Sequence, residues 1–304
     1  MWSRRSFLQQ ASLALASMTI PNSYAATAKV GPYGKPIGIQ LYTLAAAAAK
    51  DLQGTLAALA EIGYREIELP GGPMRKPVAE VNKLFADLGL SCPSIHAGMQ
   101  ELQANAQEKI ELARALNAQY LVCAFPSTAD ARFATNPLKA AAGMTLADWQ
   151  WNAEQLNRIG ALAKQAGIRL AYHNHNLEFR AFDGKLAFDE LLRLTDPALV
   201  AFEMDIAWVV TGGADPLHYL HDHANRIELL HLKEVRKDLQ VVVDQIKAQT
   251  TELGKGLIDW PTLFKAVNPK QVRHYFVEQE NFEGPPLDAV RVDFEYLANL
   301  GARI

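Results

Sequence analysis

The chain has 304 residues, of which 49% are hydrophobic, and its formal net charge is -3. This is ordinary globular composition, and the length suits one large α/β domain or two small ones. The near-neutral charge gives no electrostatic basis for binding nucleic acid, so a nucleic-acid partner is not expected.

The chain begins with a segment typical of an export signal. Arg4 and Arg5 form a paired-arginine start, an apolar stretch follows over residues 11–20, and small residues occupy positions 23 and 25. This pattern resembles a twin-arginine (Tat) signal peptide, which we assign to residues 1–26. The apolar stretch is too short to span a bilayer comfortably. We therefore expect an exported, periplasmic protein without a stable membrane anchor.

After this segment, short apolar runs alternate with longer helix-like segments. Strands are predicted at 36–44, 65–70, 92–98, 120–125, 168–175, 200–209, 227–233 and 274–279. Helices are predicted at 52–62, 78–88, 102–116, 146–165, 188–194, 216–223, 260–266 and 287–300. The strands are continuous apolar runs, which is typical of parallel strands that helices cover.

This alternation predicts an α/β fold, a single-domain (β/α)8 TIM barrel over residues 27–304. A doubly wound open sheet is the alternative, but the glycine-rich turn expected after its first strand is missing from Gln40–Thr43. Two long connections, 126–145 and 235–258, follow strands on the C-terminal side, where they are candidate lids or substrate walls.

Acidic and imidazole side chains gather at the C-terminal ends of the last four predicted strands. A barrel brings such strand ends to one mouth, so they can share an ion. Histidine with carboxylates suits Mn, Co, Fe or Zn, and three or four ligands leave a position for substrate. A structural ion pair or a core histidine is the alternative at each position. The candidate ligands are Asp205, His231, Glu278 and one of His173 and His175.

Other residues at the strand ends are candidates for substrate contact. They are His96, Glu68, Trp208, Tyr42 and His175, with packing as the alternative. Lys233 lies two residues after His231 and is expected to face the same side, where its charge can stabilise a substrate oxygen; a surface lysine is the alternative. Because side chains alternate along a strand, we expect His173 and His175 to divide between the mouth and the helical layer.

Several motifs resemble the xylose isomerase-like TIM-barrel superfamily, the group of sugar phosphate isomerases/epimerases and AP endonuclease type 2. They include GIQLYTL, GYREIEL, YHNHNLEF, FEMDIAWV, LLHLKE and HYFVEQE. The resemblance implies a metal held by His173, Asp205, His231 and Glu278. Epimerase members have glutamate where this chain has His173, and their two glutamates remove and return a proton on opposite faces of the substrate. That scheme is in doubt here, and the YHNH pattern looks more like lyase-type members.

The residues and the resemblance together predict an isomerase or epimerase that depends on one divalent ion, Mn, Co, Zn or Mg. It would act on a small sugar or polyol by removing a proton next to a carbonyl, with Glu278 or His173 moving the proton and Lys233 assisting. The alternatives are a lyase, dehydratase or keto-glycoside-cleaving enzyme, a non-catalytic sugar-binding protein, and a DNA-repair-like phosphodiesterase. The sequence leaves the oligomeric state open, a homo-oligomer included.

Overall fold

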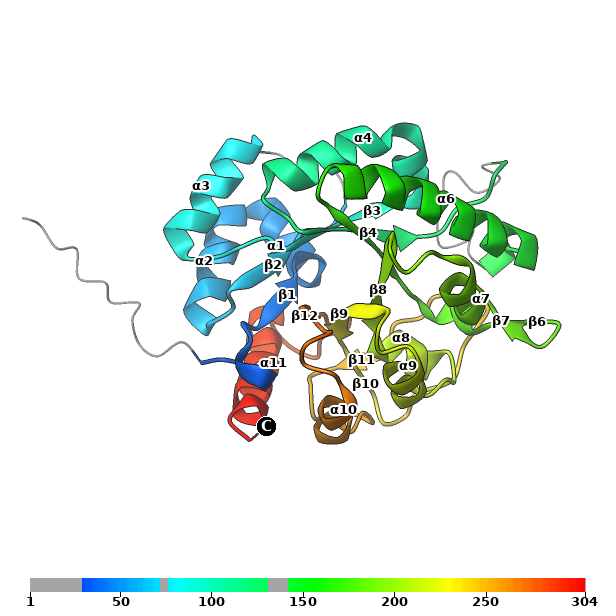
Figure 1. The fold of residues 1–304 in the computed structure, drawn as a ribbon. Coiled ribbons are helices and arrows are strands. Elements are labelled where there is room, and N and C mark those ends of the chain that lie inside the picture. Colours follow the sequence, from blue (N-terminus) through cyan, green and yellow to red (C-terminus); the bar gives the residue numbers. More distant parts are fainter. Residues whose placement is uncertain (1–28, 72–75, 131–141, 304) are drawn as a thin grey trace, which may run out of the picture.

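Eight parallel strands form one sheet in the computed structural model, which describes residues 29–71, 76–130 and 142–303 (Figure 1). Their order is β2-β1-β12-β9-β8-β5-β4-β3. The two outer strands meet through parallel bridges between Glu66 and Ser91 and between Leu69 and Ile95, which bring the sheet round into a barrel. The strands are β1 Gly38–Gln40, β2 Glu66–Glu68, β3 Ser94–Gly98, β4 Tyr120–Phe125, β5 Arg169–His173, β8 Val200–Asp205, β9 Ile227–Leu232 and β12 His274–Val277.

Helices lie around the outside of this sheet, so the predicted TIM barrel is confirmed (Figure 1). The longer ones, each of seven or more residues, follow the predicted segments closely. They are α2 Leu52–Ile62, α3 Val78–Leu88, α4 Met99–Ala115, α6 Leu146–Gln165, α7 Ala187–Leu194, α9 Pro216–Asp222, α10 Trp260–Ala266 and α11 Pro286–Gly301. The shorter elements are α1 Ala45–Lys50, α8 Ile206–Thr211, η1 Pro32–Gly34, η2 Leu41–Leu44, η3 Asn176–Phe179, β6 Ala181–Phe182, β7 Lys185–Leu186, β10 Glu234–Val235 and β11 Thr250–Thr251.

β1 and β8 each end four residues earlier than predicted, because a polar side chain caps a helix that begins there. Gln40 ends β1, and its side-chain oxygen accepts a hydrogen bond from the backbone N–H of Tyr42 at the start of η2. Asp205 ends β8 and accepts from the N–H of Trp208 in α8. Such N-cap contacts satisfy donors that the first helical turn leaves free. The apolar residues that follow therefore continue as helix.

The interior of the barrel changes character along its axis. A small apolar cluster fills the lower part: Tyr120, Val122, Ala171, Ala201, Leu229 and Phe276. Along β8 the face that carries Ala201 continues with Glu203, and along β9 the face that carries Leu229 continues with His231, because strand side chains alternate. The inward face thus becomes ionisable toward the C-terminal ends of the strands.

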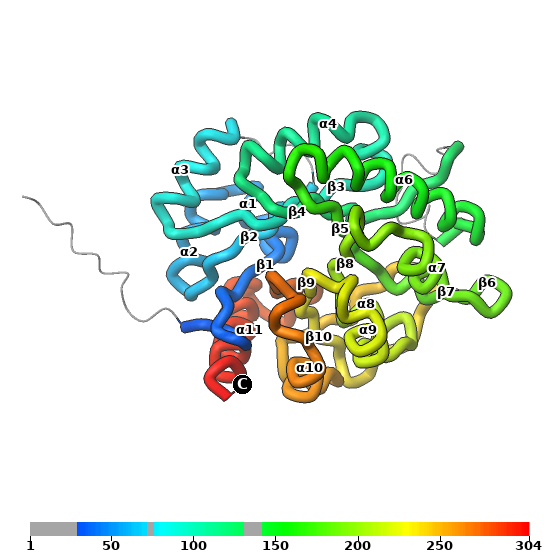
Figure 2. Tube along the Cα trace, in the orientation of Figure 1, coloured from blue at the N-terminus to red at the C-terminus, as the bar shows by residue number. Residues whose placement is uncertain are grey.

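The two ends of the described barrel lie side by side (Figure 2). Gly31, beside η1, packs so closely on Gly301 at the end of α11 that a Cβ on Gly301 would lie 2.4 Å from the Gly31 carbonyl carbon. The predicted signal peptide, residues 1–26, lies outside the described residues and stays a prediction. Within the described residues, no helix is long and apolar enough to cross a bilayer.

Two buried carboxylates hold the segment that leads into α10. Glu234 accepts hydrogen bonds from the backbone N–H groups of Gly254 and Ile258 and from the indole of Trp260. Asp293, in α11, accepts from the N–H of Leu253 at 2.7 Å. These hydrogen bonds to Glu234 and Asp293 therefore fix the end of the connection that spans residues 235–258.

Burial raises the pKa of Asp293 to about 7, so the folded chain binds this proton more tightly than the unfolded chain. The stability that this proton contributes is lost as pH rises from about 4 to about 7. Asp293→Asn should remove the loss. We expect its free energy of unfolding, relative to wild type, to rise by roughly 2 kcal/mol between pH 5 and pH 8 in urea titrations of metal-free protein.

Asp238→Asn is the control, because Asp238 is exposed and its replacement should leave the pH profile of stability between pH 5 and pH 8 as in wild type. Parallel profiles for wild type and Asp293→Asn would contradict the assignment.

Candidate metal centre

A pocket of about 570 Å³ opens at the C-terminal ends of the strands. This size is typical of small-molecule sites, and in barrels of this kind the mouth is where chemistry is placed. Side chains from at least six of the βα units reach it. Among its lining residues are Gln40, Tyr42, His96, Phe125, His173, His175, Trp208, Ile246, Glu278 and Glu280.

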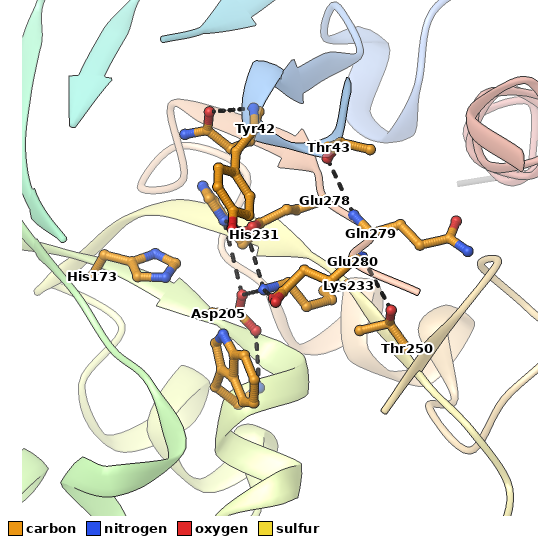
Figure 3. Close-up of polar contacts among 12 residues, drawn as sticks. Tyr42, Thr43, His173, Asp205, His231, Lys233, Thr250, Glu278, Gln279 and Glu280 are labelled. Atoms are coloured by element: carbon orange, nitrogen blue, oxygen red, sulfur yellow. Dashed lines mark hydrogen bonds and ion pairs between the residues drawn. The ribbon is translucent and has the colours of Figure 1, made fainter. Parts of the chain in front are cut away.

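The four residues predicted as metal ligands converge beside this pocket (Figure 3). His173, Asp205, His231 and Glu278 each offer one ligand atom, and these atoms all lie within 4.8 Å of one another. The Nδ1 atom of His231 is 2.7 Å from Glu278 Oε2 and 3.8 Å from Asp205 Oδ2. The strand pairing explains this, because Asp205 and His231 are directly opposed on β8 and β9.

The donor set fits a divalent transition metal. Two imidazoles and two carboxylates provide mixed nitrogen and oxygen ligands, without thiolates. Asp205 is preoriented, because its Oδ1 atom caps α8 and its backbone N–H bonds to Asn174 Oδ1. Glu278 and His173 also line the pocket, so an ion held here would be open to a substrate on that side.

Lys233 is buried among carboxylates, so the alternative of a surface lysine is wrong. Its Nζ atom lies 3.0 Å from Asp205 Oδ2, 3.1 Å from Glu278 Oε2 and 2.8 Å from Glu280 Oε1. It also lies over the ring of Trp208 at 4.7 Å from the centroid. Burial alone would lower the pKa of Lys233, but the three carboxylates raise it well above its usual value. The side chain is therefore a fixed positive charge.

The charged groups around the centre differ in their protonation. Burial raises the pKa of Asp205 to about 6 against the opposing effect of Lys233. Burial also acts to raise the pKa of Glu278, but Lys233 and His231 hold it well below its usual range. The pKa of His175 is lowered to about 3 by burial and by Lys233. Glu278 is therefore an anion and His175 a neutral imidazole at neutral pH.

Both histidines of the YHNH motif line the pocket, so the expectation that they divide between mouth and helical layer is wrong. Their ring centroids are 5.0 Å apart. Residues two positions apart share a face of an extended chain, and although β5 ends at His173, the backbone of His175 is still extended before η3 begins. His173 belongs to the ligand group, whereas His175 stacks on Phe125 at 4.7 Å and faces Trp208.

A second layer of ionisable residues lies below the ligand group. Glu203, which is not among the predicted site residues, has its Oε2 atom 2.8 Å from His96 Nε2 and 3.1 Å from His173 Nδ1. Glu68 Oε2 lies 2.6 Å from His231 Nε2 and 3.0 Å from His96 Nε2. Burial raises the pKa of Glu203 to about 7. Glu203 lies two residues before Asp205, and this spacing was the signal that could have identified it.

The predicted substrate contacts fall at different depths. His96, Trp208, His175 and Tyr42 line the pocket, and Tyr42 is 55% exposed at its rim. Glu68 is fully buried beneath it. Their contact with a substrate stays a prediction.

One of the two long connections is a wall of the pocket. Ile246 lines the pocket, and the Asn176 side chain donates to the carbonyls of Val242 and Gln245, which fixes this connection against η3. Part of the other connection, residues 131–141, lies outside the described residues.

Several other histidines lie away from this pocket. His274 pairs with Glu66 at the opposite end of the barrel, 2.9 Å apart. His218 and His221 are exposed on α9. Within the described residues, Cys92 and Cys123 are free and buried.

The fold and the site define an α/β barrel with a mixed histidine–carboxylate centre at its mouth. The model of the xylose isomerase-like TIM barrel family matches residues 56–300, and the chain belongs to this family.

Inosose dehydratase of Clostridium perfringens is 33% identical over 153 residues, 46% of this chain and 51% of that protein. The chain thus spans about half the length of the curated relatives it matches. A sugar phosphate isomerase/epimerase from Parabacteroides distasonis superposes with a TM-score of 0.72 at 24% identity, covering 90% of this chain and 95% of its own. An IolI protein with a bound zinc atom superposes with a TM-score of 0.65 at 12% identity, covering 88% of this chain and 98% of its own.

Removal of a ligand should remove the ion and leave the barrel folded. We expect Asp205→Ala and His231→Ala to weaken binding of Zn²⁺ or Mn²⁺ at least tenfold, because each takes one of four donors away. Elemental analysis after dialysis against the metal measures this. Glu228→Gln is the control, because Glu228 lies at the far end of the same strand as His231 and pairs with Arg169. Full metal content in either alanine variant would refute the ligand assignment.

Proposed function

We propose that this protein is a metal-dependent enzyme that acts on a keto-sugar or keto-polyol by removing a proton from the carbon next to the carbonyl. The observation that carries the proposal is the convergence of four ligand atoms within 4.8 Å beside a pocket lined by three glutamates and three histidines. A divalent ion held there supplies Lewis acidity, which stabilises the negative charge that proton removal leaves on the substrate oxygens.

The residues of this chain would divide the work. Glu278 is anionic and lines the pocket, so it is placed to accept a proton from a substrate carbon. His175 lines the same pocket as a neutral imidazole and can form a hydrogen bond with a substrate hydroxyl on its own side of the pocket. Trp208 and Tyr42 provide flat surfaces for a sugar ring. Lys233 keeps Asp205 and Glu278 from repelling each other.

Removal of a proton next to a carbonyl is the first step of both isomerisation and epimerisation, and these two reactions are the first candidate. Likeness to a sugar phosphate isomerase/epimerase supports it at the level of the fold. The zinc atom in the IolI structure supports a divalent ion.

Elimination of water or of a leaving group is the second candidate. The 33% identity to inosose dehydratases supports it, as does His173 in place of the glutamate of the two-carboxylate scheme.

The test is incubation of the metal-loaded protein with keto-sugars, inososes and 3-keto-glycosides in deuterated water, followed by NMR. We expect deuterium at a carbon next to the carbonyl, or loss of a substituent beside it, and the product separates the two candidates. Glu278→Gln should lower kcat by about 10²- to 10⁴-fold.

Glu228→Gln is again the control, and it should keep wild-type kcat. A metal-loaded protein that binds these sugars without exchange or elimination would refute the enzymatic proposal. Sugar affinity that survives removal of the metal would then identify a sugar-binding protein.

A further inference from the structure

Glu203 and Glu68 carry no role in the proposed reaction, yet both are buried next to the ligand histidines. We propose that they are positioning residues: each holds one nitrogen of a ligand imidazole, so that the other nitrogen faces the ion. This inference rests on the metal centre of the proposed function.

The contacts select a different nitrogen in each ring. His173 Nδ1 lies 3.1 Å from Glu203 Oε2, which leaves Nε2 as its free nitrogen. His231 Nε2 lies 2.6 Å from Glu68 Oε2, and its Nδ1 is on the side of Glu278 and Asp205. His173 Nδ1 points its N–H at Glu203, so the opposite nitrogen, Nε2, keeps its lone pair. Both nitrogens of His231 face carboxylates, with Nδ1 2.7 Å from Glu278 Oε2, so an ion bound through Nδ1 would displace the proton on that nitrogen while Glu68 holds the N–H of Nε2. His173 would therefore bind the ion through Nε2 and His231 through Nδ1.

His96 and Gln40 complete the support of these two carboxylates. His96 Nε2 lies 2.8 Å from Glu203 and 3.0 Å from Glu68, so one imidazole joins both acids. Although burial alone would lower the pKa of His96, the two acids raise it to about 9, and its positive charge offsets theirs. The Gln40 amide donates to Glu68 Oε2 at 2.9 Å. Each carboxylate is thus held by neighbours outside the ligand group.

A second ion in this lower layer is the rival interpretation. His96, His173, Glu203 and His231 also offer ligand atoms within 4.8 Å of one another. With both ions bound, His173 and His231 would each have to bind through both nitrogens. A neutral imidazole has one lone pair available for this, so both rings would have to lose their remaining proton. One ion above two carboxylate anchors avoids that requirement.

The test compares metal affinity and stoichiometry in wild type and variants, by competition with a chelator and by the absorption spectrum of bound Co²⁺. We expect one ion per chain in wild type. Glu203→Leu removes the acceptor for His173 and should weaken Co²⁺ binding about 10- to 100-fold, with an altered spectrum. Glu203→Gln and Glu68→Gln keep an acceptor oxygen and the shape of the side chain, so each should weaken binding less.

Glu66→Gln is the matched control, because Glu66 pairs with His274 at 2.9 Å in the same barrel but at the other end. It should leave metal affinity and the spectrum unchanged. Because Glu203→Leu also leaves a buried imidazole unpaired, Glu203→Gln decides the matter if the leucine variant does not fold.

Three results overturn the inference. Wild-type affinity and spectrum in both glutamine variants and in Glu203→Leu would refute the positioning role alone. Two ions per wild-type chain, falling to one in Glu203→Gln, would replace it with a second metal site. A wild-type chain that binds no ion would remove the metal centre of the proposed function and this inference with it.

Discussion

Five carboxylates buried or nearly buried at one barrel mouth are the constraint on which the rest of this site depends: Glu68, Glu203, Asp205, Glu278 and Glu280. Removing a carboxylate from water costs several kcal/mol unless a partner compensates. Lys233 compensates Asp205, and His96 compensates Glu203. His173 and His231 lie between these two groups and contact Glu203 and Glu68. The strands must keep their register for these contacts to form, because a slip of one residue would turn the acids toward the helices.

Much of the architecture could be predicted because it is local. The bounds of α2, α3, β4, α6 and α10 agree with the predicted segments, since apolar periodicity and helix-ending glycines are features of nearby residues. Strand ends were harder, because Gln40 and Asp205 cap helices with side-chain contacts that the apolar runs hide.

The candidate site divides in the same way. Because the C-terminal ends of barrel strands meet at one mouth, the sequence predicted that four residues lie close together, and they do: His173, Asp205, His231 and Glu278. Which groups neutralise one another depends on pairings across more than a hundred residues, such as His96 with Glu203, and one sequence does not contain the register that sets them. The depth of Glu68 and the burial of Lys233 follow from that register as well.

Asp205 is at once the last residue of β8, a candidate ligand and the cap of α8, and α8 carries the indole of Trp208. The ring that borders the pocket is therefore joined to the cation site through three residues of backbone. A change of substrate that required the α8 backbone to move would also move the aspartate, because Asp205 Oδ1 binds the backbone N–H of Trp208. Diversity within such a lineage should instead accumulate where the scaffold is uncoupled from the centre, at the rim around Tyr42 and on the connection that carries Ile246.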